Sequence, residues 1–226
     1  MSLCPAHPSM QLLIFDLDGT LIDSKLDLAN SVNATLLHEG RQALPVELIE
    51  SYVGNGAPVL IRRAFGPDAP QAQVDRALEF FLAHYREHML DNTRLYPGVK
   101  ESLDRFRDAG FRMAVLTNKP VRFSCDLVRG LGVGDHFFRI YGGNSFEQKK
   151  PHPMGVRQLV EEAGATNETT LLIGDSAVDV LTARNAGVRS AGVTYGFQPE
   201  GLREHPPDIL CDTMPELADQ ILAQTR

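Results

Sequence analysis

The feature that most constrains the fold is a change of hydrophobic rhythm on either side of a long helical stretch. Residues 11–16 form a short apolar run that ends in an acid, and Gly19 follows almost at once. This is typical of a buried strand that leads into a loop. From about residue 25 to residue 85, apolar residues recur every three or four positions, which predicts helices and no strand. After Tyr96-Pro97-Gly98 the pattern changes again.

The second part of the chain alternates helices with short apolar runs. We predict helices over residues 99–109, 122–131, 154–163 and 177–186, and strands over 112–116, 137–141, 170–173 and 189–193. Such alternation predicts right-handed βαβ units and a parallel sheet covered on both faces. The sheet tolerates the helical block only if that block lies outside it. We therefore predict an α/β core over residues 10–24 and 91–226, with residues 25–90 as an inserted helical cap.

Composition excludes several classes of protein. The net charge of -7 argues against a broad nucleic-acid surface, which needs clustered Lys and Arg. No apolar stretch approaches the roughly 20 residues of a membrane span, and residues 1–9, left out of the fold prediction, do not resemble a secretory signal. Cys4, Cys125 and Cys211 are sparse and odd in number, as is typical of reduced thiols. We expect a cytoplasmic protein that binds neither membrane nor nucleic acid.

Polar side chains follow three of the predicted strands. Asp16 and Asp18 follow the first, Thr117-Asn118 the second, and Asp175-Ser176 a later one, and Lys150 lies in a further loop before a helix. Ligands of open parallel sheets bind beyond the carboxyl ends of the strands, so these groups are expected to converge on one crevice. Crowded carboxylates repel one another unless a hard cation binds between them, and Mg²⁺ prefers such oxygen ligands.

This set of side chains favours phosphoryl transfer on magnesium. Asp16 and Asp175 are the expected metal ligands, and the metal would make attack on a phosphate dianion feasible. Lys150 and Thr117 are expected to hold the equatorial phosphate oxygens. Asp18, placed by the turn at Gly19, is expected to protonate the leaving group and then to activate the hydrolytic water.

In order, the motifs resemble those of the haloacid dehalogenase superfamily: Phe15-Asp16-Leu17-Asp18-Gly19-Thr20-Leu21, Thr117-Asn118, Lys150-Pro151 and Gly174-Asp175-Ser176-x-x-Asp179. The resemblance covers nearly the whole chain after Met10. Within the superfamily the chain is most similar to the phosphoglycolate phosphatases, through Tyr96-Pro97-Gly98, Thr117-Asn118-Lys119-Pro120 and Lys149-Lys150-Pro151-His152-Pro153.

The resemblance implies a Rossmann-like core, a small helical cap and Mg²⁺ as cofactor. It implies that Asp16 is both nucleophile and ligand, and that Asp175 is a ligand. It further implies that Asp18 is the acid/base and a ligand through its backbone carbonyl. The implied phosphate-binding residues are Thr117, Asn118 and Lys150.

Some positions leave two interpretations open. Asp179 lies one helical turn beyond Asp175, where it accepts a hydrogen bond from a metal-bound water or favours the first turn of its helix through the dipole. We assign Asp179 and Ser176 a supporting role. Gly54-Asn55-Gly56 is either a turn between helices or a flexible loop that senses substrate. Arg62 and Arg63 are candidates to meet a substrate carboxylate, although exposed arginines often have no special role.

The predicted function is hydrolysis of a small phosphorylated metabolite by a monomer or homodimer. The resemblance points to 2-phosphoglycolate, giving glycolate and phosphate. The alternatives are a phosphomutase of the β-phosphoglucomutase type and, less favoured, a non-catalytic phosphate-sensing protein. Dehalogenation is not expected, because the name-giving dehalogenases lack an acid that matches Asp18.

Overall fold

A six-stranded sheet lies at the centre of the computed structural model, which describes residues 11–224. Its order is β5-β4-β1-β6-β7-β8, and every neighbouring pair is parallel. The strands are β1 (Leu12–Phe15), β4 (Arg112–Leu116), β5 (Arg139–Tyr141), β6 (Thr170–Gly174), β7 (Arg189–Val193) and β8 (Ile209–Cys211). All four residues of β1 are buried, as expected for a central strand covered on both faces. The predicted Rossmann-like sheet is confirmed.

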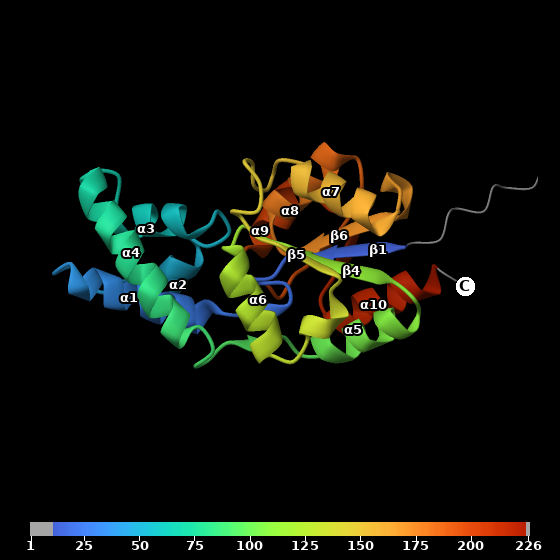
Figure 1. The fold of residues 1–226 in the computed structure, drawn as a ribbon, viewed down its shortest axis with the longest axis horizontal. Coiled ribbons are helices and arrows are strands. Elements are labelled where there is room, and N and C mark those ends of the chain that lie inside the picture. The colour runs from blue at the N-terminus through green and yellow to red at the C-terminus, as the bar shows by residue number, and fades with distance from the viewer. Residues whose placement is uncertain (1–10, 225–226) are drawn as a thin grey trace, which may run out of the picture.

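Helices cover both faces of this sheet (Figure 1). On one face lie α5 (Val99–Asp108), α6 (Val121–Gly130) and α10 (Met214–Ala223), and on the other lie α7 (Met154–Ala163) and α8 (Ala177–Ala186). Successive side chains of a strand point to opposite faces of the sheet. Leu13 and Phe15 of β1 therefore pack against the face that carries α5, α6 and α10, whereas Leu12 and Ile14 pack against the face that carries α7 and α8. The short elements η1 (Gly134–His136), η2 (Asn167–Thr169) and α9 (Pro199–Glu204) complete the core.

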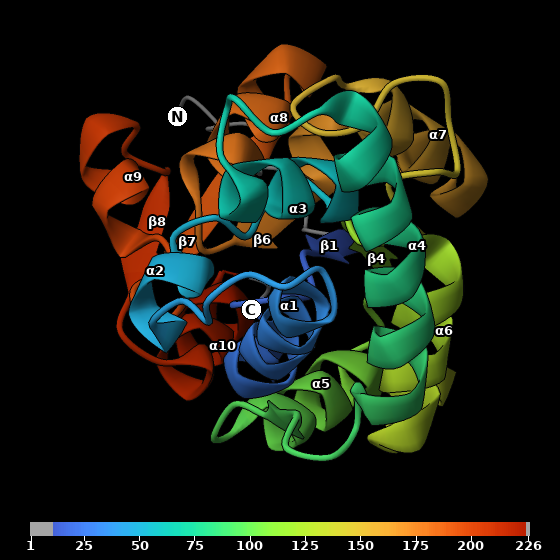
Figure 2. The same ribbon diagram turned by 90° about the vertical axis from the view of Figure 1, so that its left-hand side faces the viewer.

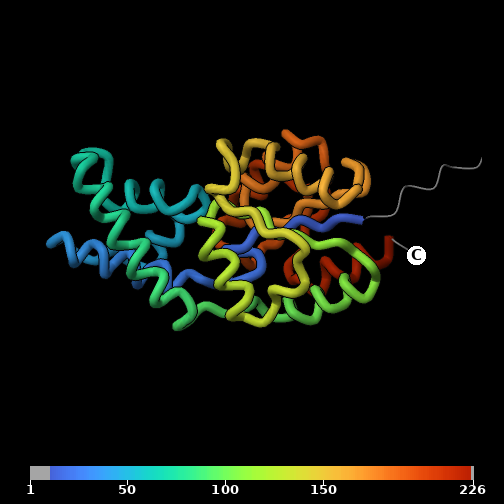
Figure 3. The backbone as a smooth tube through the Cα atoms, in the orientation of Figure 1, coloured from blue at the N-terminus to red at the C-terminus, as the bar shows by residue number. Residues whose placement is uncertain are grey.

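Four helices between β1 and the rest of the sheet form the cap. They are α1 (Lys25–His38), α2 (Val46–Glu50), α3 (Ala57–Phe65) and α4 (Gln71–His88), and no strand lies among them. Figure 2, turned toward the cap, shows these helices in front of the sheet. The chain enters the cap through β2 (Ile22–Asp23) and returns through β3 (Arg94–Leu95), which pair antiparallel, and Figure 3 traces this excursion. The predicted helical insertion is confirmed, whereas the domain limits at residues 24/25 and 90/91 stay predictions.

Several elements are additions to the sequence-based prediction. It contained five strands of the sheet and lacked β8, α9, α10 and the β2–β3 pair. Cys125 and Cys211 are free thiols, as predicted, and Cys4 and Met10 lie outside the described residues. None of the described helices combines the length and the apolar character that crossing a membrane requires.

Asp27 joins the two chain segments that connect the cap to the core. It lies in the first turn of α1 and is 1% exposed. Its carboxylate accepts hydrogen bonds from the backbone N–H and side-chain amide of Asn92, at 2.8–3.0 Å. It also accepts from the backbone N–H and hydroxyl of Thr93, both at 2.8 Å. These bonds hold the pKa of Asp27 below its usual range, although burial opposes them.

We predict that Asp27→Ala lowers the free energy of unfolding by about 2–4 kcal/mol, because it leaves the buried backbone N–H of Thr93 without an acceptor and removes the bonds to Asn92. Urea denaturation followed by circular dichroism measures the change. The exposed Asp68 provides the control, since Asp68→Ala is expected to change stability by less than about 0.5 kcal/mol. Equal stability of the two variants would contradict the role assigned to Asp27.

Candidate active site

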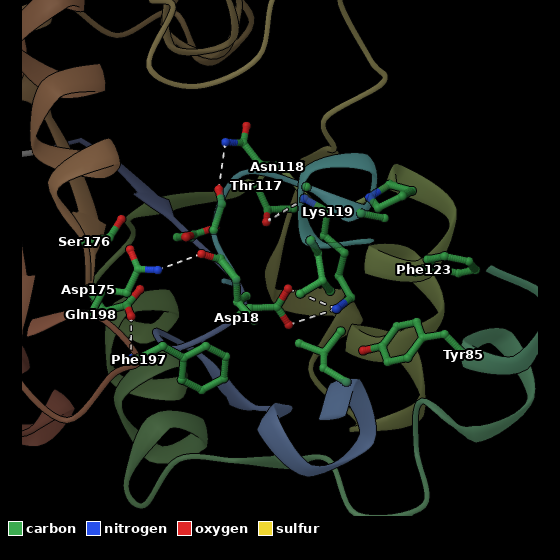
Figure 4. Close-up of a pocket in the computed structure, with 18 of the residues that line it drawn as sticks. Asp18, Tyr85, Thr117, Asn118, Lys119, Phe123, Asp175, Ser176, Phe197 and Gln198 are labelled. Carbon is green, nitrogen blue, oxygen red and sulfur yellow. Dashed lines mark hydrogen bonds and ion pairs between the residues drawn. The ribbon is translucent and has the colours of Figure 1, made fainter. Parts of the chain in front are cut away.

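A pocket of about 660 Å³, partly open to solvent, lies between the carboxyl ends of β1, β4 and β6 and the cap. Figure 4 shows side chains from both parts of the protein directed into it. The core contributes Asp16, Asp18, Thr117, Asn118, Lys119, Pro120, Phe123, Asp175, Ser176, Phe197 and Gln198, and the cap contributes Leu28, Val53, Gly54, Gly56, Ala57, Leu60, Phe81 and Tyr85.

Three carboxylates meet at the sheet end of this site. Asp16 directly follows β1, Asp175 directly follows β6, and Asp179 lies in the first turn of α8. One oxygen of each lies within 4.8 Å of the others. Asp175 is held in place by the hydroxyl of Thr20 at 3.2 Å and the backbone N–H of Phe197 at 2.7 Å. Parallel strands therefore bring together acids that lie far apart in the sequence.

The loop after β1 passes very close to Asp175. Gly19 has a φ of +82°, a conformation that glycine adopts without the steric cost of a side chain. A Cβ at this position would lie only 2.3 Å from Oδ2 of Asp175. Glycine is thus required at position 19 both for the turn and for the room that the Asp175 carboxylate occupies.

Burial and mutual repulsion disfavour the ionised form of two of these carboxylates. Burial raises the pKa of Asp175 to about 8, and the negative charges of Asp179 and Asp16 add to this effect. Burial also raises the pKa of Asp16 to about 6, although the Lys150 ammonium opposes it. A donor set of carboxylate oxygens suits a hard divalent cation such as Mg²⁺, whose charge would favour the ionised acids.

Lys150 supplies the cation that this cluster contains. It is 5% exposed, and its ammonium lies 2.9 Å from Oδ1 of Asp16 and 2.6 Å from Oδ1 of Asp179. Burial opposes its charge, but the two carboxylates outweigh burial and raise the pKa of Lys150. The neighbouring Lys149 is exposed. The structure thus directs only the second lysine of this pair into the cluster.

Asp179 has partners at both oxygens. Its Oδ2 accepts from the backbone N–H of Ser176 at 3.2 Å and from the Ser176 hydroxyl at 2.6 Å, at the start of α8. Its Oδ1 receives Lys150. Of the two interpretations left open by the sequence, support of the helix start is therefore present, and the carboxylate also belongs to the acidic cluster.

Asp18 points to a different part of the pocket. Its Oδ1 accepts from the Ser24 hydroxyl at 2.5 Å, and both of its oxygens lie 2.9 Å from the ammonium of Lys119 (Figure 4). Lys119 is buried and was not predicted as a site residue. The available signal was its position directly after Thr117-Asn118, in a segment already expected at the strand end.

Thr117 and Asn118 lie in the pocket, where their side chains also bind protein groups. The Thr117 hydroxyl accepts from the backbone N–H of Lys119 at 3.3 Å. The Asn118 amide donates to the carbonyl of Gly54 at 3.0 Å and to that of Lys150 at 3.1 Å. Asn118 therefore connects the core to the cap, and the expectation that Thr117 and Asn118 bind phosphate stays a prediction.

The segment around Gly54-Asn55-Gly56 lies over the site. Besides Asn118, Lys149 donates to the carbonyl of Asn55 at 2.6 Å and Gln198 donates to that of Val53 at 2.7 Å. Three core side chains thus bind three successive backbone carbonyls of the cap. The segment is a turn between α2 and α3, and Gly54 and Gly56 also line the pocket, so its role as a substrate-sensing loop stays a prediction.

Arg62 and Arg63 do not line the pocket. Arg62 donates to the carbonyl of Ala69 at 2.7 Å, and Arg63 donates to that of Tyr52 at 2.9 Å. Both guanidinium groups therefore bind backbone within the cap. They are not placed to meet a substrate carboxylate.

Comparison with known proteins agrees with this arrangement. Residues 13–193 match the haloacid dehalogenase-like hydrolase family. A phosphoglycolate phosphatase of Agrobacterium fabrum is 38% identical over 92% of this chain and 90% of its own length, and one of Pseudomonas putida is 44% identical over 83% and 70%. The crystal structure of a predicted phosphoglycolate phosphatase from Haemophilus somnus 129PT has a TM-score of 0.89 and 31% identity, covering 93% of this chain and 97% of its own.

The matches extend over the part of the chain that contains all of the acidic motifs, and the fold is shared as well. The resemblance expected from the sequence is confirmed at the level of the family. This chain belongs to the haloacid dehalogenase-like hydrolases.

Proposed function

We propose that this hydrolase is a Mg²⁺-dependent phosphatase that cleaves a small phosphomonoester through a phosphorylated Asp16, with 2-phosphoglycolate as its substrate. The observation that carries the proposal is the buried cluster of Asp16, Asp175 and Asp179 with Lys150, at the end of the pocket. The substrate rests on relatives of 38–44% identity that are named phosphoglycolate phosphatase. The cytoplasmic location and the oligomeric state stay predictions.

The metal would be held by the carboxylates of Asp16 and Asp175 and the backbone carbonyl of Asp18. When bound, Mg²⁺ would offset the repulsion between an anionic nucleophile and a phosphate dianion. Carboxylate oxygens of Asp16, Asp175 and Asp179 within reach of one another support a cation site here. Burial and the neighbouring negative charges raise the pKa values of Asp16 and Asp175, and a bound divalent cation would offset both effects.

In this mechanism each side chain has a separate role. A carboxylate oxygen of Asp16 attacks phosphorus, and the bond from phosphorus to the ester oxygen breaks as Asp18 donates a proton to that oxygen. Asp18 next accepts a proton from a water that attacks the acyl-phosphate, which releases phosphate and restores Asp16. The ammonium of Lys150, already beside Asp16, would stabilise charge on the equatorial phosphate oxygens, with Thr117 and Asn118.

For Asp16→Asn we predict loss of at least about 10³-fold in kcat with the fold retained, because an amide oxygen is a poor nucleophile. The measurement is phosphate release from 2-phosphoglycolate and a panel of small phosphate esters with Mg²⁺. Asp68→Asn serves as the control with parental activity. Equal turnover by the parent and Asp16→Asn would refute the nucleophile, and transfer of phosphate to a sugar instead of to water would indicate a phosphomutase.

For Asp18→Asn we predict that both chemical steps slow, because the amide neither donates a proton to the leaving group nor accepts one from water. Rapid-quench experiments with ³²P-labelled substrate measure the formation and breakdown of the phosphoenzyme. A phosphoenzyme that forms and decays at the parental rates would exclude Asp18 as the acid/base.

Because the pKa of Asp175 is raised in the folded protein, we predict that the free energy of unfolding of the metal-free protein depends on pH. The folded protein holds this proton up to about pH 8, whereas the unfolded chain loses it near pH 4, so the folded state binds more protons between these values. Stability must therefore fall as pH rises through this window. We predict a loss of about 1–2 kcal/mol between about pH 6 and about pH 8, and a much smaller loss with saturating Mg²⁺.

Thermal unfolding with EDTA or with Mg²⁺ tests this behaviour. Asp175→Asn should abolish most of the pH dependence and most of the stabilisation by Mg²⁺, while Asp68→Asn should behave like the parent. A Mg²⁺-induced rise in Tm that survives in Asp175→Asn would remove Asp175 from the metal site.

A further inference from the structure

The pocket contains a second buried cation at its cap end, away from the acidic cluster. Among the described residues that line the pocket, Lys119 is the one with a cationic side chain. The cap walls around it are apolar, made of Leu28, Val53, Ala57, Leu60 and Phe81, and the core adds Phe123 and Phe197. A charge in such surroundings is costly unless an anion accompanies it. In this structure that anion is Asp18.

Tyr85 of α4 completes the surroundings of Lys119. The ammonium lies 4.6 Å from the centre of the Tyr85 ring, a distance typical of a cation–π contact. The ring is fixed between Phe81, stacked at 5.6 Å, and Phe123, edge-on at 5.6 Å. The Tyr85 hydroxyl is buried; the Lys119 ammonium acts on its oxygen, but no described residue accepts a hydrogen bond from its O–H. In Figure 4 it points toward the part of the pocket where Lys119 and Asp18 meet.

A buried O–H without an acceptor, beside a buried ammonium, indicates a ligand that accepts hydrogen bonds and carries negative charge. Buried polar atoms are rarely left unsatisfied, because each costs free energy without a partner. The proposed mechanism requires Asp18 to reach the ester oxygen of a bound substrate, and this would take its carboxylate away from Lys119. The ammonium then needs another anion, and the apolar walls offer none.

We propose that Lys119 and the Tyr85 hydroxyl bind a carboxylate on the alcohol part of the substrate, and that they select small phosphomonoesters whose leaving group is anionic. The inference rests on the proposed function and deepens it. Phosphate and metal occupy the end of the pocket at Asp16, and the substrate carboxylate takes the place beside Lys119 that Asp18 holds in this structure. A neutral leaving group would leave the Lys119 charge uncompensated and is disfavoured for that reason.

The experiment compares two substrates of similar size, 2-phosphoglycolate and 2-hydroxyethyl phosphate, which differ in whether the leaving group carries a carboxylate. The parent is expected to prefer 2-phosphoglycolate in kcat/KM by about 30-fold or more. Lys119→Met should reduce this preference to about twofold or less, mainly by raising KM for 2-phosphoglycolate. Lys119→Arg keeps the charge and should restore part of the preference.

Tyr85→Phe provides a second variant that keeps the packed ring and removes only the hydroxyl. It should lower the preference for 2-phosphoglycolate by about tenfold, the effect of one hydrogen bond to a charged group. Lys100→Met removes an exposed lysine of α5 and should leave both substrates unaffected. Circular dichroism and thermal unfolding establish that each variant is folded.

The outcomes separate the inference from the proposed function. If Lys119 only positions Asp18, Lys119→Met slows both substrates equally, and an unchanged preference overturns the inference while the phosphatase stands. Equal hydrolysis of both esters by the parent would likewise overturn the inference and leave the proposed phosphatase activity intact. A parent that hydrolyses no phosphomonoester with Mg²⁺ overturns the proposed function and the inference together.

Calorimetry with Asp16→Asn adds a measurement that does not depend on turnover. This variant should bind 2-phosphoglycolate at least about 30-fold more tightly than 2-hydroxyethyl phosphate in the presence of Mg²⁺. Adding Lys119→Met to it should remove the difference. Equal affinities for the two esters in Asp16→Asn would overturn the inference whatever the rates.

Discussion

The crowding of three buried carboxylates around one ammonium is the constraint on which the rest of the structure depends. Asp16, Asp175 and Asp179 repel one another, and Lys150 balances only part of their charge. Holding them together requires rigid supports, which the central strands β1 and β6 and the start of α8 provide. A divalent cation bound among these carboxylates would offset their excess negative charge.

Charge also organises the other end of the pocket. Lys119 pairs with Asp18 beside the aromatic ring of Tyr85 in the cap, whereas Lys150, behind the other end of the pocket, pairs with both Asp16 and Asp179. The two ends differ in their surroundings, because carboxylate and other polar side chains surround Asp16, whereas apolar side chains surround Lys119. In the proposed binding mode, this difference would give a substrate with two anionic groups a defined orientation in the site.

The sequence predicted what depends on local pattern, and it missed what depends on long-range contact. The acids at positions 16 and 175 were expected at one sheet edge, because parallel strands align their carboxyl ends. Strand β8 is only three residues long, too short for a pattern to be distinctive. Asp27 bonds to Asn92 and Thr93 across 65 and 66 positions, and no spacing rule signals such a contact. Lys119 was missed because its role depends on Tyr85, a cap residue whose position only the folded chain defines.

The hydrogen bonds between core side chains and the backbone of the cap have an evolutionary consequence. Three of these contacts are hydrogen bonds from the core side chains of Asn118, Lys149 and Gln198 to backbone carbonyls of the cap, at residues 53–55. A backbone carbonyl is present whatever the amino acid at that position. A substitution at Val53, which lines the pocket, therefore leaves these three bonds available. This side of the pocket can change its lining during evolution and still keep its connection to the core.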